Sequence, residues 1–287
     1  MYVGAALAVG LFAQASPAGV AWLRLAGAAV VLGGWRLVTA AVARRSDRRA
    51  DRRSGSGTTQ TTRTRWTPGR VVLAGAFGVV TGGMNIVFYE AIARLPLGTA
   101  VAVEFSGPVL VAALGSRTRR DWLALGLVVV GVGLIADVRV AGSPLGVLFA
   151  FVAALAWAGY IVLGTRVSRA AGTAGEGIDG LAIGFAVAVV LFSPLALTVG
   201  RIAASPVLLA SALALGVLSS VVPYVLDQVV LRRLGRARFA LLLALLPLTA
   251  TVVGLLGLAQ IPAPLEAVGI AAVVGGVALR REPPDPG

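Results

Sequence analysis

Four ionisable side chains lie inside strongly apolar stretches of the chain: Arg24, Glu90, Glu104 and Asp227. A charge at the centre of a membrane span costs about 2.5–3.5 kcal/mol on insertion scales, so each of them needs a partner or a role. Glu104 lies near the middle of the apolar segment 97–115, and Pro108 follows one turn later. Because proline has no amide hydrogen to donate to the Glu104 carbonyl, that carbonyl is left beside the carboxylate. Together these groups could hold a cation or a proton.

Two roles are open for Glu104. It binds a coupling proton or a substrate ammonium group, or it is a buried structural partner of Arg24 or of polar groups on neighbouring spans. Arg24 lies about a third of the way into the apolar segment 17–38. Its guanidinium stays charged, and it either binds a substrate carboxylate through two parallel hydrogen bonds or neutralises Glu104. Acting together on a ligand, the two residues would suit a small zwitterion.

A polar stripe is expected late in the chain. Ser220, Pro223, Tyr224 and Asp227 follow the i, i+3, i+4, i+7 spacing that places residues on one helical face. A polar face in a membrane span should point to the protein interior or to a cavity, so Ser220, Tyr224 and Asp227 are predicted to line one. The alternative for Asp227 is a position near the cytoplasmic surface, because Arg232 follows five residues later.

Three further side chains are candidates for the lining of a pocket: Asn85, Trp157 and Tyr160. Tryptophan and tyrosine also serve as packing residues or as anchors at the membrane interface, which is the alternative for those two. Glu90 precedes Arg94 by four residues. That spacing favours an ion pair near the outer interface over a role for Glu90 in the site.

The composition argues against an enzyme. The chain has no His, no Cys and, on reading the sequence, no Lys, so all 25 basic residues are Arg. Imidazole bases, thiolate nucleophiles, lysine Schiff bases and P-loop lysines are therefore excluded. The 12 acidic residues are too scattered to suggest a carboxylate cluster for a metal. We expect no catalytic residue, no metal site and no cofactor.

The elements that must position these residues are membrane-spanning helices. Of the 287 residues, 58% are hydrophobic and 13% are charged, against about 25% charged in an ordinary soluble domain; the mean hydropathy is +0.92. A helix needs about 20 mainly apolar residues to cross a bilayer. Ten segments meet or approach that length: 1–13, 17–38, 70–93, 97–115, 122–137, 143–165, 177–199, 205–231, 237–258 and 263–280. The first indicates a short first helix or a start assigned too late. A cleaved signal peptide is less favoured, because Met1-Tyr2-Val3 carries no positive charge.

The arginines predict the orientation. With the N-terminus in the cytoplasm, 21 of them fall inside, 3 fall outside and Arg24 lies within a span, which is the positive-inside distribution. Both termini are then cytoplasmic. The segment 43–69 is predicted to be a disordered, basic cytoplasmic loop. Binding of anionic lipid or nucleic acid is its alternative role. A loop that fixes topology is favoured, because Trp66 is its only aromatic residue, and no nucleic-acid partner is expected.

An internal repeat divides the chain. Arg94-Leu95 and Arg233-Leu234 are each followed, thirteen residues after the leucine, by a proline, Pro108 and Pro247, and Leu125-Gly126 matches Val268-Gly269. The repeat predicts two five-helix units, 1–137 and 143–287, the second ending in a short tail. Because five is odd, one unit is inverted relative to the other, as in many secondary transporters. Pro108, Pro223 and Pro247 are expected to break their helices.

The sequence resembles the ten-helix EamA-type branch of the drug/metabolite transporter superfamily, and within it the threonine/homoserine-exporter-like group. The resemblance lies in residues 84–98 (MNIVFYEAIARLPLG), 104–108 (EFSGP), 157–161 (WAGYI), 219–224 (SSVVPY), 231–234 (LRRL) and 238–242 (RFALL). Where the family has Ser-Leu-Glu-Pro in the ninth span, this chain has Ala244-Leu245-Leu246-Pro247, and Gln260 stands where the family has glutamate. The first span also lacks its N-terminal half.

The resemblance implies a multi-pass protein of the bacterial inner membrane that exports a small metabolite, such as threonine or homoserine. It implies alternating access with proton exchange as the energy source. The partners are then a small-molecule substrate, the lipid bilayer and protons, with the oligomeric state left open. Because the ninth span lacks its carboxylate, the alternative is an uncoupled facilitator or a broad-specificity drug/metabolite exporter.

Overall fold

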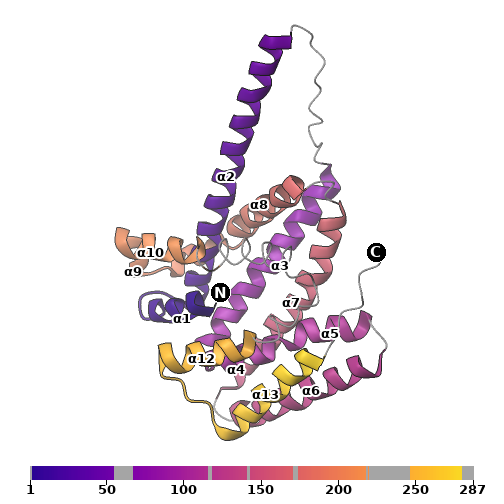
Figure 1. Cartoon of the computed structure of the whole chain (residues 1–287). Coiled ribbons are helices and arrows are strands. Elements are labelled where there is room, and N and C mark those ends of the chain that lie inside the picture. Colours follow the sequence, from indigo (N-terminus) through magenta and orange to yellow (C-terminus); the bar gives the residue numbers. More distant parts are fainter. Residues whose placement is uncertain are drawn as a thin grey trace.

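The computed structural model describes residues 2–54, 67–115, 118–140, 143–170, 174–217, 219 and 246–279. Within these ranges every regular element is a helix (Figure 1). The helices are α1 (Tyr2–Leu11), α2 (Pro17–Ser54), α3 (Pro68–Ile92), α4 (Leu97–Glu104), α5 (Ser106–Gly115), α6 (Arg119–Val140), α7 (Pro144–Ala170), α8 (Ala174–Leu191), the 3-10 helix η1 (Ser193–Thr198), α9 (Arg201–Ala204), α10 (Pro206–Gly216), α12 (Leu246–Leu258) and α13 (Pro264–Leu279).

Three of the described helices are long and apolar enough to cross a membrane: α2 over Pro17–Val42, α3 over Pro68–Ile92 and α7 over Pro144–Val167. Six more apolar helices are shorter, with 10 to 17 residues each. The expected span 177–199 is divided into α8 and η1, and much of the expected spans 205–231 and 237–258 lies outside the described residues. The described helices therefore agree with a helical membrane protein, while the count of ten spans stays a prediction.

The expectation that residues 43–69 form a disordered loop is wrong for the first part of this segment. Its first part is not a loop, because α2 continues without interruption to Ser54, and Figure 1 shows this helix extending well beyond the others. Six of the twelve residues 43–54 are arginine and two are alanine, both strong helix formers. Extending an existing helix also avoids the cost of nucleation. The first glycine after the apolar part is Gly55, and residues 55–66 lie outside the described part.

The segment 97–115 is interrupted where Pro108 predicts an interruption. Helix α4 ends at Glu104, Phe105 forms a turn, and α5 begins at Ser106. The Phe105 carbonyl accepts only a long hydrogen bond from the Val109 amide, at 3.4 Å. Pro247 is the second residue of α12, so the residues that would show a break before it are not described, and Pro223 lies outside the described ranges altogether.

Helix α3 is central to the packing. It lies against α7 and α8, while α2 packs against α8 and α10. Helix α6 runs along α13, and α4 packs against α12 and α7 (Figure 1). Small residues allow these close approaches: a Cβ added to Gly78 of α3 would lie 1.9 Å from the carbonyl oxygen of Gly184 on α8. The interhelical core so formed holds the polar residues described next.

Candidate functional site

One acidic and one basic side chain are buried in the interhelical core, on α4 and α2. Glu104, the last residue of α4, has 3% of its surface exposed, and Arg24 of α2 has 5%. Arg24 lies close enough for its charge to interact with the Glu104 carboxyl group. Burying ionisable groups costs free energy that their mutual attraction alone does not reliably recover. The two residues are therefore candidates for function as well as for structure.

Arg24 holds three parts of the chain together. Its Nη1 donates to the Tyr89 hydroxyl oxygen on α3 at 3.4 Å, and its Nη2 donates to the carbonyl oxygen of Ser219 at 3.0 Å. The guanidinium carbon also lies 5.6 Å from the centroid of the Tyr89 ring, within range of a cation–π interaction. Arg24 thus has contacts with the protein itself, and these fix where its guanidinium stands relative to Glu104.

Small residues bring the surrounding backbone to Arg24. A Cβ on Gly216 of α10 would lie 2.4 Å from the Arg24 carbonyl oxygen, and one on Gly27 would lie 2.6 Å from the carbonyl oxygen of Leu213. Helices α2 and α10 can pack this closely only because these positions lack side chains. The same packing carries the chain beyond α10 to Ser219, whose carbonyl the arginine binds.

Two buried polar atoms in this region have no hydrogen-bond partner among the described residues: Glu104 Oε2 and the hydroxyl oxygen of Tyr2 on α1. Tyr2 is 4% exposed, and its hydroxyl lies within electrostatic range of both Glu104 and Arg24. A buried polar atom left without a partner costs about 1–3 kcal/mol. Such atoms are uncommon in proteins, and a ligand that supplies the missing bonds is one explanation for them. We call Tyr2, Arg24, Tyr89, Glu104 and Ser219 the central polar cluster.

The other predicted pocket residues are placed differently. Asn85 is buried, and its amide donates to the Thr81 carbonyl oxygen of its own helix at 2.8 Å. Trp157 of α7 packs edge-on against Phe105, with ring centroids 4.7 Å apart, and so lies beside the residue that follows Glu104. Tyr160 packs against Phe77 of α3 at 5.0 Å. The expected stripe of Ser220, Pro223, Tyr224 and Asp227 falls outside the described residues.

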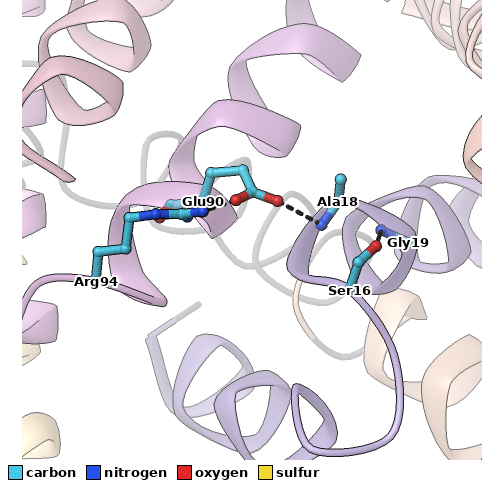
Figure 2. Close-up of polar contacts among 5 residues, drawn as sticks. All are labelled: Ser16, Ala18, Gly19, Glu90 and Arg94. Atoms are coloured by element: carbon cyan, nitrogen blue, oxygen red, sulfur yellow. Dashed lines mark hydrogen bonds and ion pairs between the residues drawn. The ribbon is translucent and has the colours of Figure 1, made fainter. Parts of the chain in front are cut away.

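The expected ion pair between Glu90 and Arg94 is confirmed. Arg94 Nη1 lies 2.5 Å from Glu90 Oε2, and Glu90 Oε1 also accepts a hydrogen bond from the Ala18 amide at the start of α2, at 3.1 Å. Figure 2 shows Glu90 between these two partners, with Ser16 bonded to the next amide, that of Gly19. Glu90 therefore stabilises the N-terminal end of α2 and is not part of the central polar cluster.

Three buried residues were not among the candidates predicted from the sequence: Tyr2, Tyr89 and Glu266. Tyr89 lies four residues after Asn85, so it shares a helical face with a residue already chosen, and that spacing could have identified it. Tyr2 gave no signal, because one tyrosine at the start of a short apolar segment resembles an interface anchor.

Glu266 is fully buried near the start of α13. It accepts hydrogen bonds from the Thr99 hydroxyl of α4 and from the Ala263 amide. A small pocket nearby, lined in part by Thr99, Thr251 and Gln260, has room for about one water molecule. That pocket is too small for an amino acid, so it is not the candidate site.

Comparison with known proteins gives consistent matches. Residues 144–280 match the EamA-like transporter family. The chain is 32% identical over 220 residues to the threonine/homoserine exporter RhtA of Salmonella typhimurium strain LT2, which covers 72% of each chain. It is 33% identical over 202 residues to the threonine/homoserine exporter RhtA of Escherichia coli strain K12, covering 69% of this chain and 67% of that one. One solved structure, titled only "Crystal structure of protein", aligns over 96% of this chain and 95% of its own, with 20% identity and a TM-score of 0.42.

Proposed function

The chain belongs to the EamA-like transporter family, and on that premise we propose that it exports a small amino acid across the bacterial inner membrane. Its relatives are named as exporters of threonine and homoserine, and these two amino acids are the first substrates to test. Transport proceeds by alternating access, with proton exchange as the energy source. The protein is a membrane transporter and has no part in covalent chemistry.

One observation carries the proposal: the buried Glu104 carboxyl group has an oxygen without a hydrogen-bond partner among the described residues, within electrostatic range of Arg24. An amino acid carries one ammonium and one carboxylate group. Glu104 accepts hydrogen bonds from the ammonium, and Arg24 attracts the carboxylate, so the bound zwitterion adds no net charge to the membrane interior. When substrate leaves, a proton on Glu104 takes the place of the ammonium.

The rest of the proposed site comes from the sequence. Ser220, Tyr224 and Asp227 are proposed as the opposite wall, and Trp157 closes the side next to Phe105, against which it packs. Asn85 and Tyr160 lie further along α3 and α7, where each has a contact within the protein. They are proposed to line the approach to Glu104 rather than to bind the charged groups.

The helix packing supports two inverted five-helix units, 1–137 and 143–287. A two-fold axis relating the units would exchange each expected span of the first unit with the span five places later in the chain. The second span (α2) would then pair with the seventh (α8), the fourth (α4) with the ninth (α12) and the fifth (α6) with the tenth (α13). All three pairs of helices are in contact. Likewise, the contact of α3 with α8 has its counterpart in that of α10 with α2, and the contact of α4 with α7 in that of α12 with α1. This exchange symmetry is what alternating access between two repeats requires.

The orientation can be tested by cysteine labelling, because the chain has no native cysteine. With both termini in the cytoplasm, Ser143 before α7 lies outside and Thr118 before α6 lies inside. A membrane-impermeant maleimide added to intact cells should label Ser143→Cys and should label Thr118→Cys only after lysis. The reverse pattern would contradict the proposed orientation.

The function is tested in proteoliposomes loaded with radiolabelled threonine or homoserine, with and without an imposed pH gradient. The wild-type protein should release substrate faster with the gradient, and Glu104→Gln should lose that response because it can no longer bind and release a proton. Glu90→Gln is the matched control, since Glu90 lies outside the central polar cluster, and it should keep the response. Unchanged transport by Glu104→Gln would remove the proposed role of this residue.

A second candidate function is an uncoupled facilitator or a broad-specificity drug/metabolite exporter. It is favoured by one position: Leu246, directly before Pro247 in α12, is apolar, so this turn of the second unit offers no carboxyl group for a proton. Substrate release that does not change with the pH gradient in the wild-type protein would select this function.

A further inference from the structure

Tyr2 brings a neutral polar group into the centre of the protein. Its side chain is 4% exposed, and its hydroxyl has no hydrogen-bond partner among the described residues. A buried tyrosine hydroxyl usually has one. Tyr89 in the same cluster is the contrast, because its hydroxyl oxygen already accepts a hydrogen bond from Arg24.

The position of Tyr2 is fixed by tight packing of α1. Gly4 approaches Ser219 so closely that an added Cβ would lie 2.6 Å from the Ser219 Cβ. Tyr2, Ala5 and Ala8 are all buried along the packed side of α1. Since the Ser219 carbonyl also binds Arg24, α1 rests on the same short segment that holds the arginine. The packing of α1 on Ser219 therefore fixes Tyr2 relative to Arg24.

We propose that the Tyr2 hydroxyl binds the side-chain hydroxyl group of the exported amino acid and so makes the transporter specific for hydroxylated amino acids. The proposal rests on the function proposed above. It assigns the ammonium to Glu104, the carboxylate to Arg24 and the substrate hydroxyl to Tyr2. Each of the three groups of the substrate then meets a protein group of matching chemistry.

The chemistry of the cluster favours a hydroxyl at this place. A phenol both donates and accepts a hydrogen bond, and so does an alcohol, so the two satisfy each other without adding charge to an apolar interior. Glu104 and Arg24 already match the two charges of an amino acid. An amino acid without a side-chain hydroxyl would leave the Tyr2 hydroxyl buried and unpaired, and sites of this kind discriminate strongly against such analogues.

The test uses three labelled substrates in proteoliposomes: threonine, homoserine and 2-aminobutyrate, which has the same carbon skeleton without the hydroxyl group. The wild-type protein should prefer both hydroxylated substrates over 2-aminobutyrate, by about tenfold or more in kcat/KM. Tyr2→Phe keeps the aromatic ring and removes only the hydroxyl, so this preference should fall to nearly one.

Tyr89→Phe is the matched control, because it also removes a buried phenol hydroxyl from the cluster. The Tyr89 hydroxyl contacts Arg24, and Arg24 is proposed to bind the carboxylate that all three substrates share. Tyr89→Phe should therefore change the three transport rates by the same factor and keep the preference for hydroxylated substrates. A preference that survives in Tyr2→Phe, or a wild-type protein with none, would overturn the role of Tyr2 and leave amino-acid export standing. If the wild-type protein transports none of the three substrates, the proposed function fails, and the role of Tyr2 fails with it.

Discussion

Gly131 of α6 and Gly269 of α13 face each other at the crossing of these two helices. A Cβ on Gly131 would lie 2.6 Å from the Gly269 carbonyl oxygen, and a Cβ on Gly269 would lie 2.7 Å from that of Gly131. The two helices come from different halves of the chain and are the fifth and tenth expected spans. Their close packing requires that both positions lack a side chain.

Gly131→Ala is therefore expected to destabilise the protein. The added methyl group must push two backbones apart, and overpacking of this kind costs about 1–3 kcal/mol. Gly133→Ala on the same helix is the control, because nothing lies within 4 Å of its added Cβ. Thermal unfolding in detergent should show a lower Tm for the first variant only. Equal Tm values for the two would mean that α6 and α13 do not cross at this point.

Helix starts were well predicted from the sequence, for a local reason. Helices α2, α3, α7, α10 and α13 each begin with a proline, a residue that suits the first helical turn and breaks what precedes it. The predicted end of α2 was wrong, because a fall in hydropathy marks where a membrane span ends and not where a helix ends. Arginine-rich sequence continues a helix as readily as it forms a loop.

The central polar cluster was only partly predictable. Glu104 and Arg24 stand out because a charge in an apolar run is rare. Whether they meet depends on how α2, α4 and α10 pack, and that follows from close approaches such as Gly216 against Arg24. A glycine in a sequence indicates where another helix can approach closely, but it does not identify which helix does so. Tyr2 was missed because only this packing brings it to Arg24 and Glu104, whereas the spacing of Tyr89 to Asn85 was a signal that could have identified Tyr89.

Gln260 joins the two halves of the chain at the start of α4. Its Oε1 accepts a hydrogen bond from the Leu97 amide at 2.8 Å, which satisfies one of the unpaired amides at a helix N-terminus. Gln260→Ala should lower the Tm, since loss of a helix cap costs about 0.5–2 kcal/mol. Gln260→Glu should keep the hydrogen bond and raise stability by about 0.3–1 kcal/mol, because a negative charge is favourable at this end of a helix. A Tm for Gln260→Ala equal to that of the wild-type protein would contradict the capping role.

Thr99 supports the fully buried Glu266. Its hydroxyl donates to the Glu266 carboxylate across the boundary between α4 and α13. Thr99→Val removes a donor to a buried carboxyl group and should cost about 1–3 kcal/mol of stability. Thr81→Val is the matched control, since Thr81 is also buried but donates within its own helix, to the Phe77 carbonyl oxygen at 2.7 Å. If both variants unfold at the same temperature, the contact between Thr99 and Glu266 contributes nothing specific to the junction.

Arg36 of α2 and Asp179 of α8 form an ion pair between the two halves on the side predicted to be cytoplasmic. The Nε–Oδ1 distance is 2.9 Å, and the side chains are 36% and 30% exposed. Partly exposed pairs contribute little to stability. A double-mutant cycle with Arg36→Gln and Asp179→Asn should therefore give a coupling below about 1 kcal/mol that decreases as salt is added.

The same pair should have a larger effect on transport than on stability. In the proposed alternating-access cycle the two halves separate on the cytoplasmic side once per cycle, so this ion pair would have to break each time, and even a small free energy would change the population of the inward-open state. We expect Asp179→Asn to accelerate maleimide labelling, in everted vesicles, of a cysteine introduced at Leu32, which lies one turn before Arg36 and belongs to the cluster that contains Phe185 of α8. The control carries Leu32→Cys alone and keeps the ion pair between Arg36 and Asp179. Equal labelling rates would show that the approach of α2 to α8 does not depend on this side chain.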